Sequence, residues 1–189
     1  MSTTDLDTIV GELGRLIQAV DAGALRALEE RIASAPRVYV AGAGRTGLVV
    51  RAFAMRLMHL GLEVHVVGDV TTPAFRSGDL LVIGSGSGET GGLRVLAERA
   101  KALGGELVVM TTVPTSTIGR LADLVVRLDA PSPKATPRPG ESAPPASAQP
   151  MGSLFEQGLL LVLDAVVMRL AAARGQSSEQ MFTRHANLE

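Results

Sequence analysis

The sequence predicts an α/β protein, a three-layer α/β/α sandwich in which helices cover both faces of a five-stranded parallel sheet. Short, continuous apolar runs alternate with segments of helical periodicity from residue 37 to residue 128. Fully apolar strands of this kind are typical of a parallel sheet buried on both faces. The chain has 189 residues, 46% of them hydrophobic, which is enough for one buried core and argues against two full domains. We therefore expect a single domain over residues 1–189.

Residues 1–34 are expected to form two amphipathic helices ahead of the sheet. Apolar side chains recur at helical spacing on both sides of a break near Asp21, and they are Ile9, Leu13, Leu16, Ile17, Val20, Leu25, Leu28 and Ile32. Aspartate is a residue type that caps helix N-termini, so Asp21 predicts where the second helix begins.

The α/β core is expected over residues 35–128. The predicted strands are residues 37–41, 63–67, 79–84, 106–112 and 123–128, and the predicted helices are 45–60, 89–103 and 115–121. Because strands and helices alternate along the chain, neighbouring strands are expected to be parallel.

Residues 129–152 interrupt this pattern with seven of the ten prolines of the chain. Proline cannot support a sheet ladder, so we expect an extended or mobile tether or lid. Residues 153–189 then begin with a strong helix, for which Ser153 is the predicted cap and Gly175 the predicted end. Its apolar residues cover more than one face, so we expect it to pack against other subunits together with the N-terminal helices. A short helix from Ser177 precedes the polar tail.

Two glycine-rich loops carry the clearest chemical signal. Each follows a predicted strand and opens a helix, which brings backbone N–H groups and a helix N-terminus to the edge where open α/β sheets bind ligands. In the second loop, "IGSGSGET", the hydroxyls of Ser85, Ser87 and Thr90 can surround a phosphate, and Gly86 lets the backbone approach it. This loop has no lysine, so a Walker-type nucleotide site is not expected.

The first loop, "AGAGRTG", leaves an alternative open. It matches the G-x-G-x-x-G fingerprint, and Asp69 follows the next strand at about the spacing of a ribose-binding acid, so a dinucleotide-binding oxidoreductase is a competing hypothesis. However, Gly44, Arg45 and Thr46 form a polar tip better suited to a sugar or a phosphate. The second loop also has no place in a simple dinucleotide domain. Together the two loops favour a sugar phosphate.

Composition excludes several other classes of function. The net charge is −1, with 18 basic and 19 acidic side chains, so neither nucleic acid nor an anionic membrane is an expected partner. The sequence contains no cysteine, which excludes disulfides, thiolate metal sites and cysteine nucleophiles, and its three histidines lack metal-ligand spacing. The N-terminal residues do not resemble a signal peptide and no apolar run could span a membrane, so we expect a soluble, cytoplasmic protein.

The paired loops, above all "SGSGET" at the start of a helix, resemble the sugar isomerase (SIS) domain, which binds phosphosugars on a flavodoxin-like sheet. The stretches "FAMRLMHLG", "QPMGSLFEQ" and "RHANLE" extend the resemblance over nearly the whole chain to the 6-phospho-3-hexuloisomerase family. This chain departs from the family pattern at Thr46, where a serine is common, and in its proline-rich residues 129–150.

The resemblance implies an enzyme that interconverts 3-hexulose 6-phosphate and fructose 6-phosphate through a cis-enediolate, with no metal or organic cofactor. It also implies a homotetramer (or dimer) in the ribulose monophosphate pathway of formaldehyde fixation, beside a 3-hexulose-6-phosphate synthase. Two alternatives remain within SIS domains. One is an isomerase of the arabinose 5-phosphate type, and the other is a phosphosugar-binding regulator without catalysis.

Moving a carbonyl to the neighbouring carbon requires a base and a proton donor. The resemblance implies that the base is Glu156, although an acid in a first helical turn also complements the helix dipole. His185 and His59 are the candidate proton shuttles, in the same or a neighbouring subunit. The structural alternatives are that His185 is a solvated residue of the tail and that His59 is a hydrogen-bonded residue at a helix end. A carboxylate facing a phosphate would be repelled, so Glu89 is expected to bind backbone donors or a basic side chain.

Overall fold

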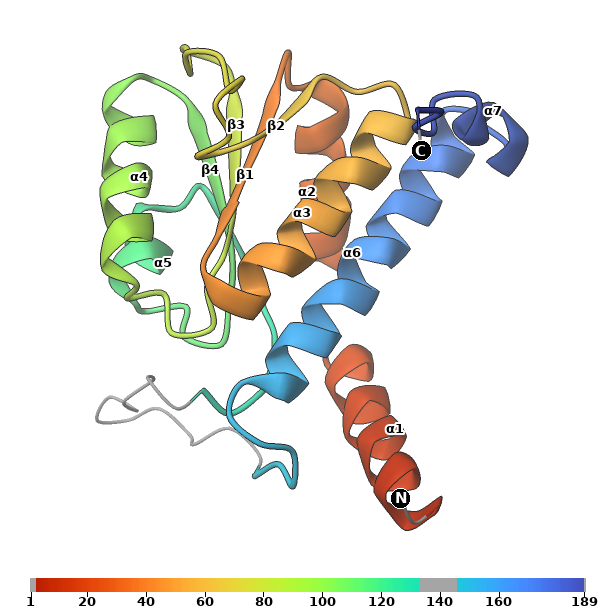
Figure 1. Ribbon diagram of the computed structural model, residues 1–189. Helices are drawn as coiled ribbons and strands as arrows, with labels where there is room; N and C mark the ends of the chain where they lie inside the picture. The colour runs from red at the N-terminus through yellow and green to blue at the C-terminus, as the bar shows by residue number, and fades with distance from the viewer. Residues whose placement is uncertain (1–2, 133–145, 189) are drawn as a thin grey trace.

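The chain folds as the predicted α/β/α sandwich (Figure 1). The computed structural model describes residues 3–132 and 146–188. Its strands are β1 (Val38–Gly42), β2 (Val64–Val66), β3 (Leu80–Gly84), β4 (Glu106–Thr111) and β5 (Leu124–Arg127). All neighbours pair in parallel, in the order β2-β1-β3-β4-β5, which is the flavodoxin-like order.

Helices lie on both faces of this sheet. They are α1 (Thr3–Gln18), α2 (Ala22–Ser34), α3 (Gly44–His59), α4 (Gly91–Ala102), α5 (Thr117–Leu121), α6 (Ser153–Ala173) and α7 (Ser178–Phe182). One face is covered by α2, α3 and α6, and the opposite face by α4 and α5 (Figure 1). None of the helices in the described part of the chain is both long and apolar enough to cross a bilayer.

Each strand sends alternate side chains into two separate cores, because successive residues of a strand point to opposite faces. Val38 and Val40 of β1 enter the larger core, which contains residues of α2, α3 and α6. Tyr39 and Ala41 enter the smaller core beneath α4 and α5. The continuous apolar runs of the sequence therefore correspond to strands that are buried on both faces.

The helix α6 finds most of its packing within the chain. It contacts α1, α2 and α3, and α1 itself projects from the body of the molecule (Figure 1). Leu160, Leu161 and Met168 remain 36%, 41% and 72% exposed. The broad apolar surface of α6 predicted contacts with other subunits. Neighbouring helices of the same chain cover much of that surface, and the contact with other subunits stays a prediction.

The predicted helix ends are largely confirmed. The Asp21 carboxylate accepts the N–H of Gly23 at 2.6 Å and caps α2, and Gly175 (φ 61°) follows the last turn of α6. Ser153, however, is not a cap: Gly152 is the N-cap of α6 and Ser153 is the first helical residue. Five of the seven prolines in residues 129–152 lie at 133–145, outside the described residues, so the predicted tether is untested there.

Candidate active site

The two glycine-rich loops meet at the carboxyl ends of β1 and β3, between which the strand order reverses. They enclose a pocket of ≈ 310 Å³ together with the start of α6. All the predicted substrate-binding residues and the predicted base line it, and they are Gly44, Arg45, Thr46, Ser85, Gly86, Ser87, Thr90 and Glu156. The loops converge because parallel strands end at the same edge of a sheet.

The first loop has glycines for reasons of packing. A Cβ on Gly42 would lie 3.0 Å from the Cα of Gly47, and a Cβ on Gly47 would lie 2.9 Å from the carbonyl oxygen of Gly42. These two glycines let the start of α3 approach the end of β1. Asp69, the acid of the dinucleotide hypothesis, is outside the pocket and forms an ion pair with Arg51 at 2.5 Å. The fingerprint is therefore explained without a dinucleotide.

The second loop presents buried hydroxyl groups whose orientation is set by its own backbone. The Ser85 hydroxyl accepts the N–H of Gly88 at 3.2 Å, and the Ser87 hydroxyl accepts the N–H of Glu89 at 3.2 Å. Both side chains are buried, at 3% and 6% exposure. A hydroxyl that accepts such a bond keeps its own proton for donation, which suits the oxygens of a phosphate.

Two threonines of the neighbouring strand end hold this loop, and sequence analysis missed them. The carbonyl of Gly86 accepts the hydroxyls of Thr111 at 3.0 Å and Thr112 at 2.9 Å, and also the N–H of Thr112 at 3.0 Å. Across a trans peptide the following N–H points the opposite way, so the N–H of Ser87 is turned away from these threonines. The only sequence signal was their position at the end of a predicted strand.

Glu156 and Arg45 form the polar rim of the pocket. An Arg45 Nη1 atom lies 3.0 Å from a Glu156 carboxylate oxygen and donates to the Ser153 hydroxyl at 3.1 Å. Ser153 therefore serves the site in place of the capping role predicted for it. The Glu156 side chain is 18% exposed, so it is partly shielded but open to a ligand. Gly84, a glycine of the second loop, also lines the pocket, and the pocket residues missed from sequence are Ala43, Leu93, Ser132, Met151, Gly152 and Phe155.

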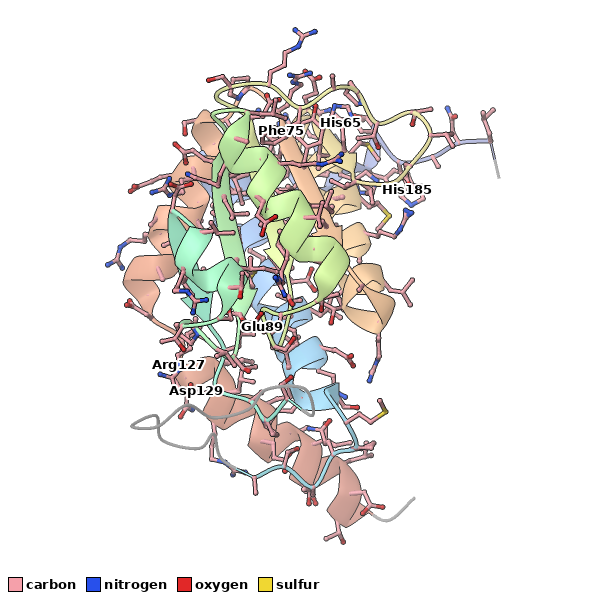
Figure 2. The ribbon with its side chains drawn as sticks, turned by 90° about the vertical axis from the view of Figure 1, so that its left-hand side faces the viewer. His65, Phe75, Glu89, Arg127, Asp129 and His185 are labelled. Carbon is pink, nitrogen blue, oxygen red and sulfur yellow. The ribbon has the colours of Figure 1, made fainter. Side chains whose placement is uncertain are left out.

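Glu89 binds a helix N-terminus, as expected. Its carboxylate accepts the N–H of Thr117, the first residue of α5, at 2.7 Å. Burial raises the pKa of Glu89, but the hydrogen bonds from Thr117, with Arg94 and Arg120 nearby, outweigh burial and leave that pKa below its ordinary value. In Figure 2, Glu89 lies at the pocket end of the sheet.

The two candidate histidines lie at the other end of the molecule. His59 ends α3, whose first residue lines the pocket, and sixteen helical residues separate these ends by about 22 Å. His59 stacks on His185 with ring centroids 5.4 Å apart. Figure 2 shows His185 far from Glu89. One chain therefore does not bring either histidine to Glu156.

The buried His59 predicts a pH-dependent stability. Burial, and then the charges of Arg56 and His185, hold the pKa of His59 below 6.5. Protonation therefore favours the unfolded chain: this stability is present above about pH 6.5 and is lost as the pH falls through the folded-state pKa. We expect urea midpoints of the wild type to fall more steeply between pH 7.5 and pH 5.5 than those of His59→Gln. His65→Gln is the control, and parallel slopes for His59→Gln and the wild type would contradict the prediction.

The chain is similar to known proteins over most of its length. A family model described as the SIS domain matches residues 31–158. The 3-hexulose-6-phosphate isomerase of Bacillus subtilis is 48% identical and aligns with 86% of this chain and 85% of its own length. That of Mycobacterium gastri is 44% identical over 99% and 91%. A Methanococcus jannaschii crystal structure, from which a 3-hexulose-6-phosphate isomerase function was inferred, has 30% identity, a TM-score of 0.84 and coverage of 98% and 99%.

Proposed function

This chain belongs to the SIS domain family, and from that premise we propose that it interconverts 3-hexulose 6-phosphate and fructose 6-phosphate. The observation that carries the proposal is the ion pair of Glu156 with Arg45, which lines the pocket beside the second glycine-rich loop. A carboxylate beside a cation and next to an anion-binding loop is suited to take a proton from a phosphosugar held by that loop.

The reaction moves two protons. In this proposal the phosphate lies against Ser85, Ser87 and Thr90, and Glu156 takes the proton from C2 of the 3-hexulose. The electrons of that C–H bond form the C2–C3 double bond of a cis-enediolate, and the C3 carbonyl oxygen takes up charge beside Arg45. Glu156 then returns its proton to C3, while the O2 proton is transferred to O3, so that the carbonyl is at C2.

The proton transfer between O2 and O3 needs a further group. His59 and His185 of the same chain lie at the opposite end of α3, so in this proposal a histidine from a neighbouring subunit would serve. The exposed apolar residues Leu6, Val10 and Met168 of α1 and α6 support this by offering a surface to another subunit, and the family resemblance implies a homotetramer (or dimer). The cytoplasmic location, the ribulose monophosphate pathway and a 3-hexulose-6-phosphate synthase partner also remain proposals.

The test is the activity of the purified wild type on enzymatically generated 3-hexulose 6-phosphate, with fructose 6-phosphate formation as the readout. We expect turnover of this substrate and roughly 100-fold lower kcat/KM for arabinose 5-phosphate, the order of magnitude that one missing carbon of a substrate costs in a fitted pocket. Faster turnover of arabinose 5-phosphate would favour the other isomerase class. Binding of fructose 6-phosphate without turnover of either substrate would indicate a phosphosugar-binding regulator.

A further inference from the structure

We propose that Glu12 of α1 is a positioning residue for the candidate active site and acts through residues 147–149. The Glu12 carboxylate accepts the Ser147 hydroxyl at 2.6 Å, the Ala148 N–H at 2.7 Å and the Gln149 side-chain amide at 2.9 Å. These donors follow one another in the chain, about 135 residues after Glu12. A single acidic side chain therefore holds a short segment from a distant part of the sequence.

The contact keeps Glu12 ionised although its side chain is buried. Glu12 is 6% exposed, and a buried carboxylate is costly unless hydrogen bonds replace its water. The bonds from Ser147, Ala148 and Gln149 lower the pKa of Glu12, burial opposes them, and Arg15 adds a smaller lowering. All three hydrogen-bond donors come from this segment, so separating it from α1 would leave the charge without them.

The segment leads directly into the pocket. Two residues after Gln149, Met151 lines the pocket in the left-handed backbone region (φ 55°), which a non-glycine residue keeps only when its surroundings hold it there. The carbonyl of Gly152 then accepts the N–H of Glu156 at 3.0 Å. The entry of the chain into α6, and with it the position of Glu156, is therefore constrained on the side that Glu12 anchors.

The packing of α1 against α6 does not depend on the contact of Glu12 with residues 147–149 alone. Leu16, on the same helix, is 2% exposed and belongs to the larger core with residues of α6. Glu12 contacts residues 147–149 before α6, which lie outside any helix or strand and none of which is buried. The geometry therefore favours a role of Glu12 in positioning the segment beside the pocket over a role in attaching α1.

The experiment compares Glu12→Gln with Asp7→Asn, an exposed carboxylate on the same helix. The glutamine replaces an acceptor oxygen with an NH₂ group that faces other donors. We expect roughly a 10- to 100-fold fall in kcat with KM within about threefold, because a displaced base affects the chemical step more than phosphate binding. Hydrogen exchange of residues 147–153 should accelerate at least tenfold, and Asp7→Asn should change neither quantity.

A second variant with a smaller change tests the same contact in case Glu12→Gln does not fold. Ser147→Ala removes one of the three donors, and we expect a smaller fall in kcat. The double variant should lose less than the product of the two single effects, because both substitutions break the same contact. Faster exchange with unchanged kcat would overturn the positioning role, and unchanged exchange would overturn the anchor itself.

The kinetic part of this inference rests on the proposed isomerase function, and the two can fail separately. If the wild type were inactive on both sugar phosphates, the proposed function would fall. The exchange of residues 147–153, measured with and without fructose 6-phosphate, would still decide the anchor. Protection by the ligand in the wild type and its loss in Glu12→Gln would support it, and equal protection in both would overturn it.

Discussion

Glu156→Gln is expected to lower the isomerase kcat by about 10³-fold, within the range that a positioned general base contributes. Glutamine has nearly the shape of glutamate but cannot take the C2 proton. It can still accept a hydrogen bond from Arg45, whose Nη1 lies 3.0 Å from the carboxylate, so the pocket should keep its form. The fructose 6-phosphate Kd, measured by calorimetry, should change less than fivefold, within about 1 kcal/mol.

The control is Glu98→Gln, an exposed glutamate on α4 outside the pocket, which should retain wild-type kcat. Two results would count against Glu156 as the base. One is a Glu156→Gln variant with more than a tenth of the wild-type kcat. The other is a loss of fructose 6-phosphate binding that accounts for the whole loss of activity.

Gly88→Ala is expected to disrupt the conformation of the second glycine-rich loop and to weaken ligand binding. Gly88 has φ 61°, and a Cβ there would lie 1.9 Å from the Ser116 hydroxyl oxygen and 2.5 Å from its Cβ. Ser116 cannot move away freely, because it is 1% exposed and caps α5 by accepting the N–H of Gly119 at 3.1 Å. The left-handed conformation and the overlap together predict a loss of about 2–4 kcal/mol in the free energy of unfolding. Binding of fructose 6-phosphate should fall at least 100-fold.

The matched control is Gly92→Ala, the same substitution four residues later. Gly92 lies in the first turn of α4, has ordinary helical geometry, and a Cβ there meets nothing within 4 Å. Alanine should therefore keep ligand binding and stabilise the helix by roughly 0.5–1 kcal/mol. Urea denaturation and calorimetry of both variants make the comparison. Equal stability of Gly88→Ala and the wild type would mean that the loop adapts around Ser116.

Sequence patterns were sufficient to predict the layers, the strands and the meeting of the two glycine loops. Apolar runs and helical periodicity record which faces of each element are buried, and parallel strands must end at one edge. The place of Glu156 in the first turn of α6 followed from the same local pattern, and its side chain does line the pocket. Its assignment as the base came from the family resemblance and awaits the experiment above.

The histidines and the supports of the site could not be predicted in this way. His185 was proposed from the family resemblance and His59 as a second candidate, in the same or a neighbouring subunit. Within one chain, the length of α3 separates His59, and the His185 ring stacked on it, from the pocket. Ser153 looked like a cap and instead accepts a hydrogen bond from Arg45.

The sequence by itself determined the fold class, the two glycine-rich loops and most helix ends, because these depend on burial periodicity and on bonds between residues a few positions apart. Only the tertiary structure decided that Thr111 and Thr112 hold Gly86. It also decided that Glu12 holds residues 147–149. The position of both histidines away from Glu156 was likewise decided by the tertiary structure. Those relations join segments that are distant along the chain. The way in which helices pack on the sheet, which no local pattern encodes, brings such segments together or keeps them apart.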